Sequence, residues 1–526
     1  MPEFNLGTWD LGLIFIYFAI VLYIGIRVGG DHKNAEDYFL AGRSMIWPFV
    51  GISLFASNIS STTLIGLSGD AYATGISVFN YEWMASVILV FFAIFLLPVY
   101  LRSKVYTMPE FLECRFDSRS RYYFAIITLV GNILIDTAAA LYAGGILLQM
   151  IFPAMALWQI ILVLSVCAGI YTIIGGLKAV IYTDAIQTVL IMIGAVTVSW
   201  LAFEQVGSWD AVKAVTPPDM LSLVRPADDA AMPWTGLLFG VPILGFYFWC
   251  TNQFMVQRVL SAKNNRHGRY GLLLAALLKL PIIFIMVLPG SMARVLYPEL
   301  DNPDLVYPTM IFDLLPAGLL GLVVAGILAA LMSSIDSTLN SASTLVTMDF
   351  VRKARPDISS HGLMTVGRIT AFIFMLLAAA WAPFISEFGS LFKYMQSVLA
   401  YIAPPVVAVF LLGVLWRGAT ANGAFYSLMI GLVLAIGMLV GQGSGAFSMH
   451  FLHAAGLLFV VCLVAVVAIS LADSNKASAT QHGYMWNKQD FAAELKGERA
   501  LPWWQNYLVL SSLLLMVTAV LVISFW

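Results

Sequence analysis

The chain is poor in charged residues and in cysteine, and each shortage excludes a class of protein. Only 11% of its 526 residues are Asp, Glu, Lys or Arg, and the formal net charge is −2. A soluble domain carries about 25% charged residues, and a nucleic-acid binder needs a basic surface, so both classes are excluded. The four cysteines show neither the spacing of a disulfide framework nor that of a metal site. The sequence also lacks a G-x-x-x-x-G-K-[ST] motif, which argues against ATP as an energy source.

Long apolar runs are what the sequence has in abundance, and 60% of its residues are hydrophobic. A run of ~20 apolar residues spans the ~30 Å hydrocarbon core of a bilayer as a helix. Fourteen such runs lie at about 9–28, 46–70, 78–101, 122–150, 155–175, 180–203, 233–257, 270–293, 316–347, 364–385, 389–414, 419–441, 450–471 and 505–525. The sequence therefore predicts an all-α polytopic membrane protein with about 14 transmembrane helices, in contact with the lipid bilayer.

The distribution of Lys and Arg predicts how the chain is oriented. With the N-terminus outside, nearly all basic residues fall in inside loops, and only Lys213, Arg225 and Arg294 fall in outside loops. Basic residues favour the cytoplasmic side, so we expect both termini outside the plasma membrane, which is the inner membrane if the source is bacterial. The first apolar run lacks a cleavage pattern and is interpreted as a true span rather than a signal peptide.

Two of the predicted spans contain helix-breaking segments. In the second, residues 57–63 (SNISSTT) are polar apart from Ile59, and the seventh carries Gly240, Pro242 and Gly245. A broken helix would expose carbonyl groups to a cation and N–H groups to a solute; the alternative is an unbroken helix that packs small polar residues against its neighbours. Each segment opens a block of five spans, which is typical of an inverted-repeat transporter. We therefore expect one domain, 1–526, with repeats at 46–203 and 233–414 and peripheral helices in 1–45 and 415–526.

Ionisable residues at membrane depth are costly and are functional candidates, unless they reach the interface from the end of a span. They are Glu82, Asp136, Asp184, Lys279 and Asp336. In the ninth span, Ser333, Asp336, Ser337 and Asn340 have the spacing of one helix face, with Ser334 beside it. Such oxygen ligands suit a hard monovalent cation, although a structural polar seam would have the same spacing. Asp184 is a second carboxylate that could reach this face.

Several stretches in these regions resemble a known family. They include EDYFLAGRS, SNISSTTLIGLSG, YTMPEFLECRF, IYTDAIQT, LKLPIIFIMVLPG, AALMSSIDSTLNSASTLVTMD and YIAPPVVAVFLLGVLWR. Together they resemble the sodium/solute symporter family, most closely its sodium–glucose cotransporter branch. The resemblance implies a leucine-transporter-type core of five plus five inverted helices, with one extra helix before it and three after it. It also implies a transporter rather than an enzyme, which uses alternating access and sodium as the coupling ion.

The resemblance carries a set of sodium residues onto this chain. The main site would use carbonyl groups and hydroxyls of Ala56, Ile59, Ala330, Ser333 and Ser334. A second sodium site would use Asp184, Ser333, Asp336 and Ser337. Asp336 departs from the hydroxyl usual in the family, and its carboxylate could strengthen cation binding or carry a proton. One or two cations per cycle are both left open.

The resemblance also carries over most of a sugar site. The matching contacts are Asn58, Glu82, Trp249, Lys279 and Gln396, and Thr63 and Phe248 stand where the branch has other side chains. We expect a neutral sugar similar to glucose or galactose as the solute. Inositol or another polyol, sialic acid, proline and pantothenate are the alternatives, and an ion channel is less favoured because no filter loop is found. Glu82 would repel a carboxylate, whereas hydroxyls at the helix break could bind one.

Overall fold

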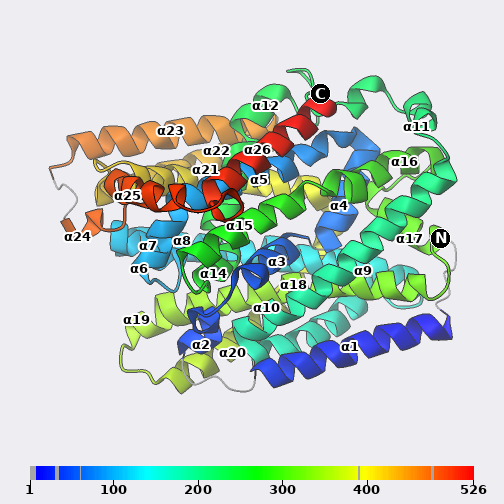
Figure 1. Cartoon of the computed structure of the whole chain (residues 1–526), viewed down its shortest axis with the longest axis horizontal. Helices are drawn as coiled ribbons and strands as arrows, with labels where there is room; N and C mark the ends of the chain where they lie inside the picture. The colour runs from blue at the N-terminus through cyan, green and yellow to red at the C-terminus, as the bar shows by residue number, and fades with distance from the viewer. Residues whose placement is uncertain (1–6, 30–34, 60, 389–390, 475–478) are drawn as a thin grey trace.

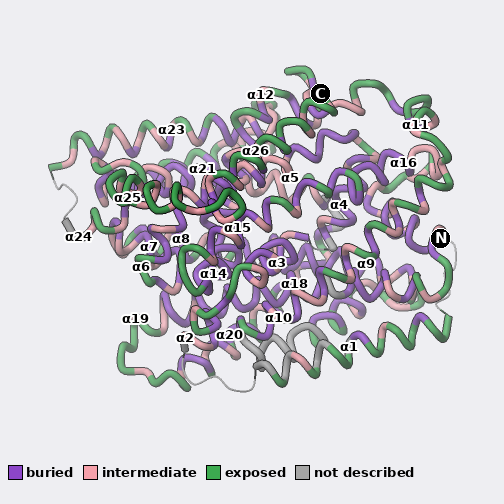
Figure 2. The backbone as a smooth tube through the Cα atoms, in the orientation of Figure 1, coloured by how far each residue is buried: buried purple, intermediate pink, exposed green. Residues whose placement is uncertain are grey.

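The computed structural model describes residues 7–29, 35–59, 61–388, 391–474 and 479–526, and across these the chain is helical, with no β-strand. Most helices run along the same direction and pack side by side into one bundle (Figure 1). The buried residues gather along the inside of this bundle, and many large apolar side chains on its outer helices are exposed (Figure 2). An exposed apolar surface of this extent suits contact with lipid rather than with water.

In the first half of the chain, several consecutive helical elements join into one continuous longer helix. The elements are α1 (Thr8–Gly29), α2 (Ala35–Leu40), α3 (Trp47–Asn58), α4 (Ser61–Thr74), α5 (Asn80–Phe91), η3 (Phe92–Leu96), α6 (Leu97–Ser103), α7 (Met108–Arg115), α8 (Ser118–Gly131), η4 (Asn132–Thr137), α9 (Ala138–Ile151), α10 (Leu157–Val206) and α11 (Trp209–Val215). The segments η3 and η4 are π-helical turns that join α5 to α6 and α8 to α9 without a break.

The second half repeats this construction. Its elements are α12 (Trp234–Phe239), α13 (Val241–Phe246), η6 (Tyr247–Thr251), α14 (Gln253–Leu260), α15 (Asn265–Lys279), η7 (Ile283–Val287), α16 (Leu288–Leu296), α17 (Val306–Leu314), α18 (Leu319–Leu345), η9 (Val346–Val351), α19 (Arg352–Ala354), α20 (Ser360–Trp381), η10 (Ala382–Phe388), α21 (Leu391–Leu415), α22 (Ala421–Gly443), α23 (Phe451–Ala472), α24 (Ala479–His482), α25 (Lys488–Arg499) and α26 (Tyr507–Ser524). Here η6, η7 and η9 are the π-helical turns.

The described helices account for all fourteen predicted spans. Nine are long and apolar enough to cross a membrane by themselves, and two bent pairs, at 47–74 and 265–296, raise the number to eleven. The remaining three predicted spans coincide with the shorter apolar stretches Thr8–Tyr17, Leu157–Val166 and Leu319–Leu328. The positions of the predicted spans agree with the helices, while the number of membrane crossings and the limits of the two repeats stay predictions.

The long element α10 covers two of the predicted spans, 155–175 and 180–203. The side chains of Leu164 and of Leu331, which belongs to α18, both lie next to Gly144. Arg258 donates hydrogen bonds both to Asp184 and to Ser337 of α18, and so joins these two residues. A straight helix would separate Leu164 from Asp184 by ~30 Å, but would separate Leu331 from Ser337 by only ~9 Å. Leu164 and Asp184 therefore belong to two segments of α10 that both lie beside the middle of α18, as two spans would.

The predicted break in the second span is confirmed. The axes of the two helices that form this span differ by 53°, and Ile59 leaves the helical conformation with φ −80° and ψ 84°. In the seventh span the predicted weak point is only a mild interruption: α12 ends at Phe239 and α13 begins at Val241, while Gly240 keeps a helical conformation with φ −101° and ψ −55°. The chain leaves the helical conformation further on, at Asn252, with φ −63° and ψ 128°. Pro242 is tolerated because it stands in the first turn of α13.

Candidate functional site

A polar cavity lies where the broken second span meets α5, η6, α18 and α21. It encloses about 940 Å³ of empty space, part of it open to solvent, which lies within the range of small-molecule sites. Its wall consists of Ser57, Asn58, Thr62, Thr63, Tyr81, Glu82, Asp136, Ala140, Leu244, Gly245, Phe248, Trp249, Phe254, Ser334, Thr338, Phe392, Met395, Gln396 and Leu399. Six of the seven predicted solute residues are in this wall, and the seventh, Lys279, lies behind it.

Glu82 and Lys279 form a buried ion pair at the wall. The Lys279 Nζ atom donates to Glu82 Oε2 at 2.5 Å, and the Lys279 side chain is fully buried. The same Nζ atom lies 5.3 Å from the centroid of the Trp249 ring, within the range of a cation–π contact. Lys279 therefore neutralises Glu82 and fixes its position, and only the carboxylate and the indole face the cavity.

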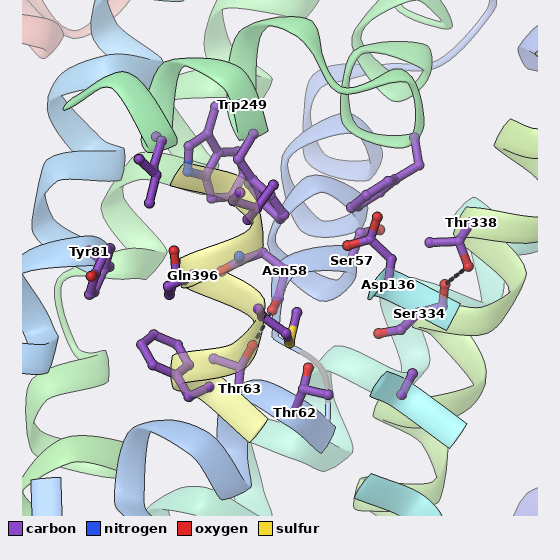
Figure 3. Close-up of a pocket in the computed structure, with 18 of the residues that line it drawn as sticks. Ser57, Asn58, Thr62, Thr63, Tyr81, Asp136, Trp249, Ser334, Thr338 and Gln396 are labelled. Atoms are coloured by element: carbon purple, nitrogen blue, oxygen red, sulfur yellow. Dashed lines mark hydrogen bonds between the residues drawn. The ribbon is translucent and has the colours of Figure 1, made fainter. Parts of the chain in front are cut away.

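The helix break supplies one unsatisfied acceptor to the same cavity. The Thr63 hydroxyl donates to the Asn58 carbonyl oxygen at 2.6 Å and so bridges the break (Figure 3). The Asn58 side-chain oxygen is buried and finds no hydrogen-bond partner in the described part of the chain. A buried acceptor without a partner costs about 1–3 kcal/mol, so a ligand that donates to it recovers this free energy.

Aromatic side chains close the cavity on two sides. Tyr81 and Phe392 meet edge to face with ring centroids 5.5 Å apart. Beyond them a second cavity of about 670 Å³ begins, and its wall shares Tyr81, Phe392 and Gln396 with the first. On another side the Phe248 ring packs against the rings of Trp249 and Phe254, with centroid distances of 5.2 and 5.6 Å. Gln396 is therefore reachable from both cavities, while aromatic rings limit the passage between them.

The predicted main sodium site adjoins this cavity. Ser334 is part of the cavity wall, and the carbonyl groups in the last turn of α3, which includes Ala56, are those that a helix end leaves without intrahelical partners. Ile59 follows directly in a non-helical conformation. Ala330 and Ser333 belong to α18, but their side chains lie outside the described residues. The five-residue sodium site stays a prediction.

At the predicted second sodium site the structure places Arg258, which directly follows the predicted span 233–257 in the sequence. Arg258 Nη2 lies 3.3 Å from Asp184 Oδ2, and Arg258 also donates to Ser337 and to Ser53. Ser53 donates to the same Asp184 oxygen at 2.5 Å. Asp184 and Ser337 are thus brought together as expected, with a guanidinium between them. Asp336 is fully buried in α18 outside the cavity wall.

An all-helical bundle in which broken helices meet at a polar cavity is the architecture of a secondary transporter. Residues 38–431 match the model of the Sodium:solute symporter family, and the chain belongs to this family. It is 35% identical to sodium/glucose cotransporter 1 of Oryctolagus cuniculus over 520 residues, which cover 88% of this chain and 78% of that protein. It is 37% identical to sodium/myo-inositol cotransporter 2 of Homo sapiens over 522 residues, which cover 89% of this chain and 77% of that protein.

Solved structures show the same fold. A Na+-coupled sialic acid symporter in a substrate-bound outward-open state superposes with a TM-score of 0.79 at 24% identity, over 90% of this chain and 99% of that one. Mhp1, a nucleobase-cation-symport-1 family transporter, superposes with a TM-score of 0.58 at 13% identity, over 86% of this chain and 99% of that one. The protein is therefore a multi-pass, sodium-coupled solute symporter, and the predictions of the family, of an all-α fold rich in apolar helices and of sodium as coupling ion are confirmed.

Proposed function

We propose that the protein imports a neutral sugar or polyol across the plasma membrane, together with sodium, by alternating access. One observation carries this proposal: Asn58, Glu82, Trp249 and Gln396, from four different helical segments, face a single cavity. The family resemblance predicted these residues together, as contacts of one solute site. Their convergence depends on the fold and not on their proximity in the chain.

The chemistry of the cavity suits a solute with several hydroxyl groups. The Glu82 carboxylate and the Asn58 side-chain oxygen accept hydrogen bonds, the Gln396 amide both donates and accepts, and the Trp249 indole offers an apolar face. A sugar or a cyclic polyol presents hydroxyls around its rim and C–H groups on its faces. Such a solute satisfies the polar groups and covers the indole at the same time.

The two departures at the wall bear on which neutral solute is preferred. Thr63 uses its hydroxyl on the Asn58 carbonyl, and Phe248 has no polar group, so neither extends a hydrogen-bonding arm into the cavity. With fewer hydrogen-bonding side chains in the wall, fewer hydroxyl groups of the solute are recognised by a specific hydrogen bond. Glucose, galactose and inositol are the candidates, and the similarity to both sodium/glucose and sodium/myo-inositol cotransporters supports testing all three.

The position of Ser334 suggests how the ion and the solute are coupled. Its side chain is in the cavity wall, and α18, which carries it, faces the broken end of α3. A sodium ion bound between these helices would hold the helix break in one conformation, in which Asn58 faces the solute. We propose that this mutual ordering, rather than direct contact, gives coupling between the two binding events.

Uptake into proteoliposomes tests the proposal. Labelled glucose, galactose and myo-inositol are offered under an inward sodium gradient and, in parallel, under an equal potassium gradient. We expect sodium-driven accumulation of at least one of them, suppressed by the unlabelled solute. If labelled proline, pantothenate or sialic acid accumulates instead, the assignment to neutral sugars and polyols is wrong while the family assignment stands.

A further inference from the structure

The cavity contains a second carboxylate, Asp136, which belongs neither to the predicted solute site nor to the predicted sodium sites. Asp136 is part of the cavity wall. Figure 3 shows it with Ser57, Ser334 and Thr338 on one side of the cavity, across from Gln396 and Tyr81. Unlike Glu82, which is paired with Lys279, it has no basic residue beside it among the described residues of the cavity wall. A carboxylate in this position is costly at membrane depth and calls for a functional reason.

A π-helical turn is what brings Asp136 to the cavity. The turn η4 covers Asn132–Thr137, and the Thr137 hydroxyl donates to the Asn132 carbonyl five residues earlier at 2.7 Å. Two hydrogen bonds anchor this turn to α18: Asn132 to Ser341 at 3.0 Å and Thr137 to Thr338 at 2.7 Å. The extra residue of a π-turn rotates the following side chains. The residue before Thr137 is thereby held rigidly at the cavity while Thr137 itself faces α18.

The charge of the wall follows from these contacts. Glu82 is neutralised by Lys279, and the wall includes no Lys, Arg or His among the described residues. Asp136 therefore leaves the cavity with a net negative charge when it is ionised. A carboxylate-bearing solute meets like-charge repulsion there, which costs several kcal/mol in a partly desolvated site, whereas a hydroxyl can donate to the carboxylate.

We propose that Asp136 is a specificity-determining residue of the solute site: its carboxylate accepts hydrogen bonds from solute hydroxyls and rejects acidic solutes. The inference rests on the proposed function and deepens it, because it assigns the solute to the neutral polyhydroxy class on the basis of a residue outside the predicted site. Asp136 lies on one side of the cavity, and Glu82 and Gln396 lie on the other. The solute would therefore form hydrogen bonds on two opposite sides.

The test compares neutral and acidic competitors of matched shape. Uptake of the transported solute by wild-type protein is inhibited with D-glucose, myo-inositol and D-glucuronate, and the same series is measured for Asp136→Asn. We expect glucuronate to inhibit the wild type at least ~100-fold more weakly than the best neutral competitor. In Asp136→Asn the neutral solute should bind about 10-fold more weakly, the discrimination against glucuronate should fall to within ~10-fold, and sodium half-saturation should stay unchanged.

Asp210→Asn is the matched control, because Asp210 lies in the short helix α11 with a 90% exposed side chain, and it should leave every value unchanged. Equal inhibition of the wild type by glucose and glucuronate overturns the inference, and this measurement does not depend on the variant folding. Wild-type solute affinity in Asp136→Asn overturns it as well, as does a change confined to sodium activation. These results differ from a failure of the proposed function, in which the wild type itself accumulates no neutral solute.

Discussion

Two of the buried ion pairs in the described part of the chain differ in what surrounds them. Glu82 and Lys279 meet at the wall of the solute cavity, and the Glu82 carboxylate remains open to a ligand. Asp184 and Arg258 meet in a closed cluster, where Ser53 and Ser337 take up further hydrogen-bonding capacity. The first pair is arranged so that a solute can complete it, whereas the second is completed by the protein itself. The comparison indicates that the first pair serves binding and the second serves the integrity of the helix packing.

The largest effect should come from breaking the closed pair. Arg258→Met removes the guanidinium and leaves Asp184 as an uncompensated charge among buried groups, which we expect to lower the free energy of unfolding by about 3–5 kcal/mol. Thermal unfolding of the purified protein measures this loss. The double variant Arg258→Met with Asp184→Asn should regain most of it, and a double variant as unstable as the single one would contradict the pairing.

Breaking the open pair should affect binding more than stability. Glu82→Gln keeps the shape of the side chain but removes the charge that accepts from the solute, so we expect solute affinity to fall about 10- to 100-fold. Solute half-saturation of uptake at high sodium gives the value. The loss of thermal stability should be smaller than that of Arg258→Met, because the introduced amide oxygen can still accept a hydrogen bond from the buried Lys279 ammonium. Equal destabilisation by the two changes would erase the distinction between the pairs.

Removing an uncharged hydrogen-bonding side chain from the same cavity should lower the solute affinity by a smaller factor. Gln396→Ala deletes the amide but leaves no charge uncompensated, and we expect about 5- to 10-fold weaker solute binding. Sodium activation should stay at its wild-type value. Isothermal titration with the solute at saturating sodium measures the change, and unaltered affinity would remove Gln396 from the solute site.

The sodium site can be separated from the solute site at Ser334. Ser334→Ala removes one neutral oxygen near the broken helix, and we expect the sodium concentration for half-maximal uptake to rise about 5-fold. Once sodium is saturating, the solute affinity should return to the wild-type value. A change in solute affinity that excess sodium does not correct would place Ser334 in the solute site only.

The smallest change in solute affinity is expected at Phe248, where the wall presents an apolar ring in place of the side chain usual in the sodium–glucose cotransporter branch. Phe248→Tyr adds one hydroxyl at the edge of the cavity, and we expect solute affinities to change about 2- to 5-fold, unequally for glucose and inositol. The ratio of their half-saturation concentrations is the readout. An unchanged ratio would mean that the wall at Phe248 does not distinguish solutes by their hydroxyl groups.

Much of the site could be predicted from local sequence patterns. Six polar residues in the segment 57–63 indicated the break at Asn58 and Ile59, and the shortage of other charges in the spans pointed to Glu82 and Lys279. These signals were sufficient because a polar group at membrane depth is costly wherever its partner lies. The family resemblance then assigned roles to residues that pattern alone could not distinguish.

Other features could not be predicted in this way. Arg258 follows an apolar run and looked like a loop residue, because nothing local shows that Asn252 turns the chain back towards Asp184. The seventh span was expected to break at Gly240, where the structure has only a boundary between two helices, and the chain leaves the helical conformation at Asn252 instead. Asp136 was recognised as an ionisable residue at membrane depth but not as part of the cavity, because helical periodicity assumes 3.6 residues per turn and η4 departs from that value.

The sequence by itself determined the class of protein, the positions of the long apolar helices and the coupling ion. Each of these depends on properties carried by short stretches: apolar length and the motifs of the symporter family. Only the tertiary structure decided that Arg258 pairs with Asp184 and that Asp136 faces the cavity. Pairing depends on distances between helices that are remote in the chain, and hydrogen bonds and ion pairs act over a few ångströms, so a one-residue rotation at a π-turn is enough to move a carboxylate from a helix contact into the solute site.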